Sequence, residues 1–203
     1  MASLRERKKA ETRQRIADVA TPMFVARGFD NVTITDIADA AGVSKVTVFN
    51  YFSRKEDIFF DRIPEAKGLL TEALQDRAEG ESPVRAVRRL LLRLAGEGHP
   101  LGGFQDRYLS FWRTVLGSSA LRARAREALE EVEDHLADLF TAAHDPHPRL
   151  SAALVIAAYR SAFTSGVRRM LTGDRAVDVT ADHVAAVEHA FDVLAEGLAQ
   201  GRR

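Results

Sequence analysis

The segment from Thr33 to Phe52, TITDIADAAGVSKVTVFNYF, constrains the fold of this chain more than any other stretch, because it predicts two short helices joined by a glycine turn. Thr33 and Asp36 have the spacing of a capping box at the start of the first helix. Gly42 can adopt the left-handed conformation of a sharp turn, and Ser44 can cap the second helix. Apolar residues three and four positions apart predict one buried face in each helix. In the first helix this face consists of Ile34, Ile37, Ala38 and Ala41, and in the second helix of Val48 and Phe52.

Two helices in this order are typical of the helix-turn-helix, in which the second helix enters the major groove of DNA. An ordinary helical hairpin is the alternative, because amphipathic helix pairs joined by a glycine are common in α proteins. If the segment reads DNA, the outward residues of the second helix would meet the groove. These residues are Lys45, Val46, Thr47, Asn50 and Tyr51.

The neighbouring sequence favours the first interpretation. An upstream helix ends at Arg27-Gly28-Phe29, and Ser53 with Glu56 predicts a further capping box. Residues 12–62, about a quarter of the chain, resemble the N-terminal domain of the tetracycline-repressor (TetR) family of transcriptional regulators. The resemblance is carried by Phe24, Gly28, Phe29, Thr33, Ile37, Ala38, Ala41, Gly42, Val43, Ser44, Phe52, Lys55 and Glu56.

This resemblance implies a DNA-binding domain over residues 1–52 and a ligand-binding and dimerisation domain over residues 53–203. In the family, the positions of Thr33, Tyr51 and Lys55 contact phosphate. Phe49 stands where a tyrosine often contacts phosphate, so we expect Phe49 to pack or to touch a thymine methyl group. The DNA-binding set expected here is Thr33, Ser44, Lys45, Val46, Thr47, Phe49, Asn50, Tyr51 and Lys55.

Composition limits the classes of protein to consider. With 203 residues and 46% hydrophobic content, the chain can bury a substantial core. It contains no cysteine, which excludes disulfides, thiol catalysis and thiolate metal sites. No uninterrupted run of eighteen apolar residues is present, and the polar N-terminus lacks the apolar stretch of a secretory signal. We therefore expect a cytoplasmic protein without a membrane span.

Charge is distributed unevenly along the chain although the net charge is zero. Residues 1–15 hold six basic and two acidic side chains. A basic arm beside a helix-turn-helix favours contact with phosphate or the minor groove, and a solubilising tail is the alternative.

Helical spacing with cap signals continues to the C-terminus and no strand-like alternation occurs, which predicts an all-α protein of about nine helices. Pro22 is expected to kink the first helix and Pro64 the fourth. The later helices are expected at about Ser82–Gly96, from Phe104 to Gly117, and at about 119–141, 148–172 and 180–199.

The last two helices differ from the others in their side chains. The eighth is rich in small residues, including Ala158 and Ala162, and the ninth has apolar residues at alternating intervals of three and four. Such a seam could close an intramolecular bundle. TetR-like proteins dimerise through their last two helices, so the resemblance implies a homodimer interface formed by Ala158, Ala162, Val184, Val187, Phe191, Leu194 and Leu198.

Aromatic side chains gather in the second half of the chain, where they could form plain core. TetR-like proteins usually enclose an apolar effector cavity in these helices, so the resemblance implies that some of these residues line a pocket. The expected lining is Phe104, Tyr108, Phe111, Trp112, Tyr159 and Phe163.

The sequence offers no catalytic constellation, and no cofactor is expected. His144 and His147 share a loop with Asp145, but they lack further ligands at helical spacing, so no metal site is expected either. The sequence thus predicts a homodimeric, ligand-responsive regulator. We expect a repressor that an apolar small-molecule effector releases from a palindromic double-stranded DNA operator. A helical small-molecule-binding protein or enzyme with an incidental helix-turn-helix is the alternative.

Overall fold

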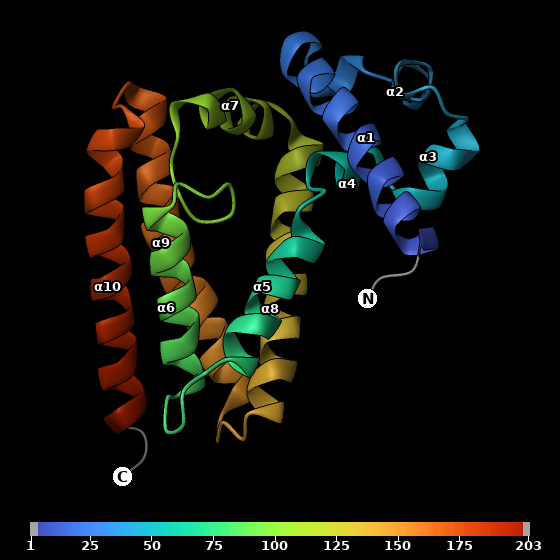
Figure 1. Ribbon diagram of the computed structural model, residues 1–203. Helices are drawn as coiled ribbons and strands as arrows, with labels where there is room; N and C mark the ends of the chain where they lie inside the picture. Colours follow the sequence, from blue (N-terminus) through green and yellow to red (C-terminus); the bar gives the residue numbers. More distant parts are fainter. Residues whose placement is uncertain (1–3, 201–203) are drawn as a thin grey trace. The chain divides into compact units, whose positions relative to one another are not determined.

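A computed structural model describes residues 4–200, with side chains from 7 to 197. Every regular element in this part of the chain is helical, as the sequence predicts (Figure 1). Ten α-helices are present over these residues, one more than the expected number of about nine. The helices separate into two compact units, and each has its own core.

The first unit comprises residues 1–61 together with residues 110–126. Its core is built from apolar faces of the helices and is rich in phenylalanine, with Phe24, Phe29 and Phe59 all buried. Its elements are α1 (Leu4–Arg27), η1 (Phe29–Asn31), α2 (Ile34–Ala41), α3 (Lys45–Tyr51), α4 (Lys55–Phe59), most of α7 (Leu109–Gly117) and the start of α8 (Ser119–Ala142).

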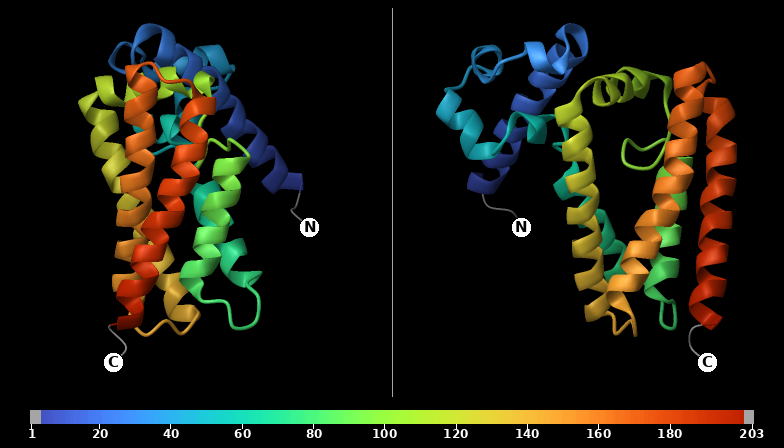
Figure 2. Two further views of the ribbon diagram at one scale, coloured as in Figure 1. Left: turned by 90° about the vertical axis from the view of Figure 1, so that its left-hand side faces the viewer. Right: turned by 180° about the vertical axis from the view of Figure 1, so that it is seen from behind.

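The second unit comprises residues 62–109 and 127–203. In both views of Figure 2, α9 and α10 lie side by side, and α6 packs against α10. A core of Leu, Val, Ala and Phe side chains fills the space among its helices. Its elements are α5 (Ile63–Gln75), α6 (Pro83–Gly96), η2 (Asp106–Tyr108), the remainder of α8, α9 (Pro148–Thr172) and α10 (Ala176–Gln200).

The additional helix arises where the sequence predicts a single kinked fourth helix. The chain leaves the α-helical conformation between Phe59 and Ile63, and Pro64 lies in the first turn of α5. Proline is well suited to that position, because the first turn has no hydrogen-bond partner for a backbone N–H. Pro22, by contrast, lies within α1, which continues through it to Arg27.

Two other expected boundaries change. The sequence predicts that the sixth helix carries Phe104, but this residue lies in the loop before η2 and α7. The last helix begins at Ala176, one turn before the expected start, where the Asp106 carboxylate accepts a hydrogen bond from the Ala176 N–H at 2.8 Å. The division between the units also differs from the expected boundary after Phe52, because the first core includes Ile58 and Phe59 of α4.

Candidate functional site

The turn between α2 and α3 has the geometry that the sequence predicts. The Thr33 hydroxyl accepts a hydrogen bond from the Asp36 N–H at 3.1 Å, and the Asp36 carboxylate accepts one from the Thr33 N–H at 2.8 Å. These bonds keep the pKa of Asp36 below its usual value, mainly through the Thr33 N–H. Gly42 ends α2 with φ of 64°, and Ser44 caps α3 by accepting from the Thr47 N–H at 3.0 Å. Helix α3 therefore has a fixed direction relative to α2.

The inward face of this helix pair anchors it to the first core. Ile37, Val48 and Phe52 are buried, and all belong to the cluster around Phe24 and Phe59. Because α3 is held by its buried side, its opposite side is free to meet a ligand.

The outward face of α3 is exposed and unusually apolar for a solvent-facing helix. Val46 is 68% exposed and Phe49 54% exposed, with Lys45 and Asn50 also exposed beside them. The alternative that Phe49 packs into the core is therefore wrong. The side-chain types on this face match the base edges of a major groove: an amide, an ammonium group and apolar groups for thymine methyls.

Arg13 of the basic arm is integrated into the first unit. Its guanidinium donates to the Tyr51 carbonyl at 2.7 Å and lies 4.1 Å from the centroid of the Phe52 ring. This contact holds the end of α3 against α1. The other basic side chains of the arm that the structure describes, Arg7, Lys8, Lys9 and Arg15, are exposed, while the Arg5 side chain lies outside the described residues.

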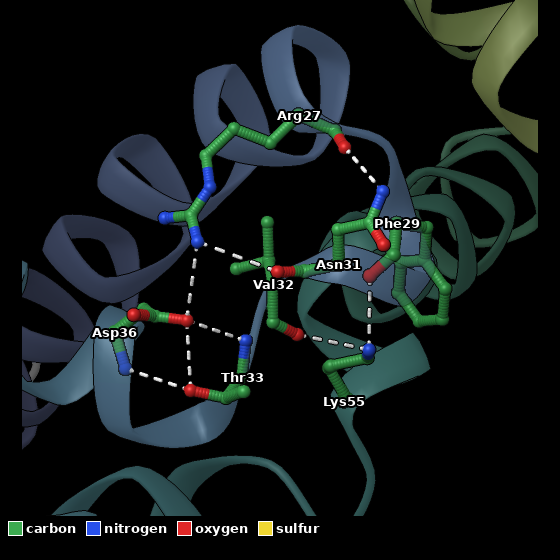
Figure 3. Close-up of polar contacts among 7 residues, drawn as sticks. All are labelled: Arg27, Phe29, Asn31, Val32, Thr33, Asp36 and Lys55. Atoms are coloured by element: carbon green, nitrogen blue, oxygen red, sulfur yellow. Dashed lines mark hydrogen bonds and ion pairs between the residues drawn. The ribbon is translucent and has the colours of Figure 1, made fainter.

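Lys55 faces into the first unit (Figure 3). Its ammonium donates to the carbonyl groups of Phe29 at 2.9 Å and Val32 at 3.0 Å, and it lies 4.2 Å from the centroid of the Phe29 ring. Figure 3 also shows Arg27, which lies 3.5 Å from the Asp36 carboxylate. Lys55 thus has an internal role, with two of its three N–H groups bonded to carbonyl groups, and its expected phosphate contact stays a prediction.

The expected capping box of α4 is shifted by one residue. The helix begins at Lys55, and the Asp57 carboxylate, rather than that of Glu56, accepts from the Arg54 N–H at 3.1 Å. The same carboxylate forms an ion pair with Arg124 of α8, whose Nε donates a hydrogen bond to Oδ1 at 2.6 Å. Arg124 is only 6% exposed. The sequence does not predict this ion pair, since the two residues are 67 positions apart and no local pattern connects them.

Segment 110–126 completes the core of the first unit. Val115 and Leu121 are buried in it, and Phe111 stacks on Phe59 at 4.6 Å between centroids. Trp112 meets Phe111 edge-on at 5.0 Å. These two aromatic residues, expected to line an effector pocket, therefore belong to the first unit.

The other aromatic residues gather in the second unit. Phe104 stacks on Phe163 at 5.1 Å, and Tyr159 lies 5.5 Å from Phe163. Tyr108 lies apart from this stack and donates its hydroxyl to the Gly98 carbonyl at 3.2 Å. The expected pocket lining is thus split into two clusters. His183 of α10, which sequence analysis did not include, contacts the second cluster: it is buried and meets Phe104 edge-on at 4.9 Å.

The apolar seam of α10 is directed into the chain's own core. Val187, Phe191 and Leu194 are at most 8% exposed, as is Ala162 of α9, and all four belong to the core cluster of the second unit. These four residues therefore pack inside the second unit and do not form an exposed face for a second chain. Ala158 and Val184 are partly exposed, and the side chain of Leu198 lies outside the described residues.

Helix α9 leaves large apolar side chains uncovered instead. Leu150 is 55% exposed and Leu154 37% exposed, and Val193 of α10 is 56% exposed. By length and composition alone α9 could cross a membrane, although it is the one such helix among the described residues and only a third of its most apolar window is buried.

Three or more metal-binding side chains do not come together anywhere in the part of the chain that the structure describes. In the loop before α9, His144 adopts a positive φ of 59°, and Asp145 accepts from the His147 N–H at 2.8 Å. That carboxylate thus has a local structural role.

Comparisons with known proteins agree with this architecture. The family model described as bacterial regulatory proteins, tetR family, matches residues 16–61. The chain is 30% identical over 142 residues to the HTH-type transcriptional regulator TcmR of Streptomyces glaucescens, covering 68% of this chain and 63% of the relative. It is 34% identical over 85 residues to the putative mycofactocin biosynthesis transcriptional regulator MftR of Mycobacterium tuberculosis, covering 40% and 42%. The matches thus span less than two thirds of the length of these curated relatives.

Solved structures show the same fold over nearly the whole chain. Thermus thermophilus FadR, a TetR family transcriptional repressor in complex with lauroyl-CoA, aligns with a TM-score of 0.56 and 27% identity, covering 91% of this chain and 94% of that one. A putative TetR-family regulator from Mesorhizobium loti aligns with a TM-score of 0.54 and 17% identity, covering 91% and 97%. Together with the capped helix-turn-helix, these similarities show that residues 16–61 form a TetR-family domain and that the chain has the fold of TetR-family regulators.

Proposed function

We propose that this chain is a transcriptional repressor that binds a palindromic DNA operator as a homodimer and releases it when an apolar small molecule binds. The observation that carries the proposal is the exposed face of α3. Val46 and Phe49 present apolar groups to solvent beside Asn50, while the opposite side of the helix is anchored in the core. Solvent alone gives no reason for this combination, whereas base edges do.

The contacts to DNA divide into two kinds. Lys45, Val46, Thr47, Phe49 and Asn50 are proposed to meet base edges, with Thr47 partly engaged, since its hydroxyl lies 2.8 Å from that of Ser44. Phosphates are proposed to meet Thr33, Ser44, Tyr51 and the exposed basic residues of the arm. The second kind of contact supplies affinity without sequence preference.

The proposed effector site lies in the second unit. Thermus thermophilus FadR, which shares this fold, was solved in complex with lauroyl-CoA, a molecule with a long apolar chain. In the present chain the aromatic cluster of Phe104, Tyr159 and Phe163 offers the corresponding apolar surroundings. We infer that effector binding there changes the packing of α8, which contributes residues to both cores.

A second copy of the chain is proposed to cover the exposed stripe of α9. Successive residues of a helix are rotated by about 100°, so side chains three, four, seven and eleven apart share a side. The ion pair of Arg169 and Asp182 marks where the outer sides of α9 and α10 meet. On that side lie Leu150, Leu154, Ala158, Ser161 and Ser165 of α9, with His189 and Val193 of α10. A two-fold axis would pair this stripe with itself, and the apolar surface of α9 would face protein rather than lipid.

We propose no catalytic role and a cytoplasmic location, since an operator-binding protein must reach the chromosome. A mobility-shift assay on the DNA upstream of its own coding sequence tests the function, with an unrelated duplex of equal length as the control. We expect retention of the upstream fragment at 150 mM salt, where the control duplex is no longer bound. Equal affinity for both duplexes would contradict the proposal and favour an incidental helix-turn-helix.

A further inference from the structure

The loop between α6 and α7 buries a phenylalanine in the second unit. Phe104 is 3% exposed although it lies outside any helix. Its ring stacks on Phe163 with an interplanar angle of 23° and meets His183 at 89°. A Cβ atom on Gly166 would come within 2.4 Å of the ring. The absence of a side chain at that position of α9 therefore leaves room for one aromatic ring. We call the space formed by Tyr159, Phe163, Gly166 and His183 the aromatic slot.

Hydrogen bonds to backbone carbonyl groups hold the loop, one from α9 and one from within the loop itself. The Tyr159 hydroxyl donates to the Leu101 carbonyl at 2.9 Å, and Gln105 donates to the Gly98 carbonyl at 2.7 Å. Gly103 packs so closely on the Gly98 backbone that a Cβ atom would lie at 2.4 Å. These contacts hold the loop, but none of these hydrogen bonds involves Phe104. Rotation of the Phe104 side chain would therefore break none of them.

His183 brings a hydrogen-bond acceptor to the slot. Its Nε2 lies 3.1 Å from the Gly102 carbonyl, and since a carbonyl only accepts, Nε2 carries the proton. In the neutral ring Nδ1 is then an acceptor. Nδ1 is buried and has no hydrogen-bond partner among the described residues. Burial lowers the pKa of His183 more than the nearby carbonyls of Gly102 and Ala162 raise it, so the ring is neutral at pH 7. Buried polar atoms without a partner are rare in native proteins.

We propose that the aromatic slot binds the effector's ring, and that this effector is a planar aromatic molecule with a hydroxyl group. The effector's ring takes the place of the Phe104 ring against Phe163, and the effector's hydroxyl donates a hydrogen bond to Nδ1 of His183. The inference rests on the proposed function, because it specifies the effector class for the site in the second unit. Phe104 then acts as an internal competitor, and the fraction of molecules with an open slot sets the apparent affinity.

The test compares 2-naphthol with 2-methoxynaphthalene, which has the same rings but no donor. Calorimetry on the full chain should show that the Phe104→Ala variant binds 2-naphthol at least about tenfold more tightly than the wild type, because the competitor is removed. In both proteins 2-naphthol should bind about fivefold more tightly than the ether, as expected for one neutral hydrogen bond. The variant His183→Gln retains a donor for the Gly102 carbonyl but loses Nδ1. Its ratio of affinities for 2-naphthol and 2-methoxynaphthalene should therefore fall to about one.

Two further measurements make the test decisive. Circular dichroism and the mobility shift on upstream DNA establish that each variant is folded and binds DNA. If DNA binding is intact but Phe104→Ala gains no affinity for 2-naphthol, or if His183→Gln keeps the wild-type preference, the subsite proposal is overturned and the proposed function stands. Equal binding of 1-decanol and 2-naphthol to Phe104→Ala would also overturn it, because the slot would then be an unselective apolar space. Loss of upstream DNA binding in the wild type would instead contradict the proposed function.

Discussion

The ion pair between Asp57 and Arg124 offers the sharpest test of how the DNA-binding unit is held together. Arg124 Nε lies 2.6 Å from the carboxylate, and the Arg124 side chain is 7% exposed while that of Asp57 is 19% exposed. Segment 110–126 therefore stabilises α4 by a buried charge contact in addition to its apolar packing. We predict that Arg124→Met destabilises the protein by leaving the carboxylate without its main counter-charge.

The magnitude follows from the burial of both groups. Removing one member of a buried ion pair costs about 3–5 kcal/mol. Asp57 is partly hydrated and still accepts a hydrogen bond from the Arg54 N–H, so we expect about 2–4 kcal/mol here. For a chain of this size 1 kcal/mol corresponds to about 2–4 °C, which gives a fall in melting temperature of about 4–16 °C.

Differential scanning calorimetry measures this shift, and Arg126→Met is the matched control. Arg126 is exposed on the same helix, and exposed substitutions usually change stability by less than about 0.5 kcal/mol. The double variant Arg124→Met, Asp57→Leu should recover part of the loss, because it removes both charges from the interior. Equal melting temperatures for Arg124→Met and Arg126→Met would refute the reasoning.

Three other changes probe the remaining contacts. Lys55→Met should lower the free energy of unfolding by about 1–3 kcal/mol through loss of its hydrogen bonds to Phe29 and Val32. The salt dependence of DNA binding should stay unchanged. If the slope of the logarithm of the binding constant against the logarithm of the salt concentration fell by about 1, Lys55 would instead contact a phosphate. Asn50→Ala should cost about 1–3 kcal/mol of operator binding and relax preference at one base pair, which a binding-site selection would detect. Burial lowers the pKa of His183, so the unfolded chain binds this proton more readily and stability should fall as pH drops below the unfolded value of about 6.5. Urea titrations of wild type and His183→Gln between pH 7 and 5 should show a smaller fall for the variant.

Local signals explain which parts of the fold could be predicted from sequence. The capping residues Thr33 and Ser44 and the turn at Gly42 depend on neighbours within four positions, and the structure reproduces all three. The helix from Pro83 and the one from Pro148 likewise begin where proline fits the first turn. The all-helical architecture follows from the same short-range patterns.

Contacts between distant residues explain what the sequence left out. Lys55 lies 23 positions from Val32, and Arg124 lies 67 positions from Asp57. A helical pattern does not predict that a lysine near the start of a helix points inward, or that a later helix completes the core of an earlier unit. For the same reason the aromatic residues Phe111 and Phe104, close in sequence, could not be assigned to separate clusters.

The dimer interface shows the same limit. Periodicity reveals that a face of a helix is apolar, but it does not say which neighbour covers it. In α9 the buried side carries small residues such as Ala152 and Ala162, while Leu150 and Leu154 are exposed. Exposed leucines one turn apart form an apolar surface that a partner would cover, which supports a second chain on the outer side of α9.

Two substitutions separate folding from assembly. Phe191→Glu places a carboxylate in the core of the second unit and should unfold the chain, because an unpaired buried charge costs several kcal/mol. Leu154→Glu should leave each chain folded but yield monomers that bind a palindromic operator weakly, since the charge is buried only in the dimer. Val177→Glu is the control, because Val177 is 66% exposed and lies on the opposite side of α10 from Asp182. Light scattering distinguishes the outcomes: a Leu154→Glu protein that remains a dimer as stable as Val177→Glu would show that the stripe of α9 is not the interface.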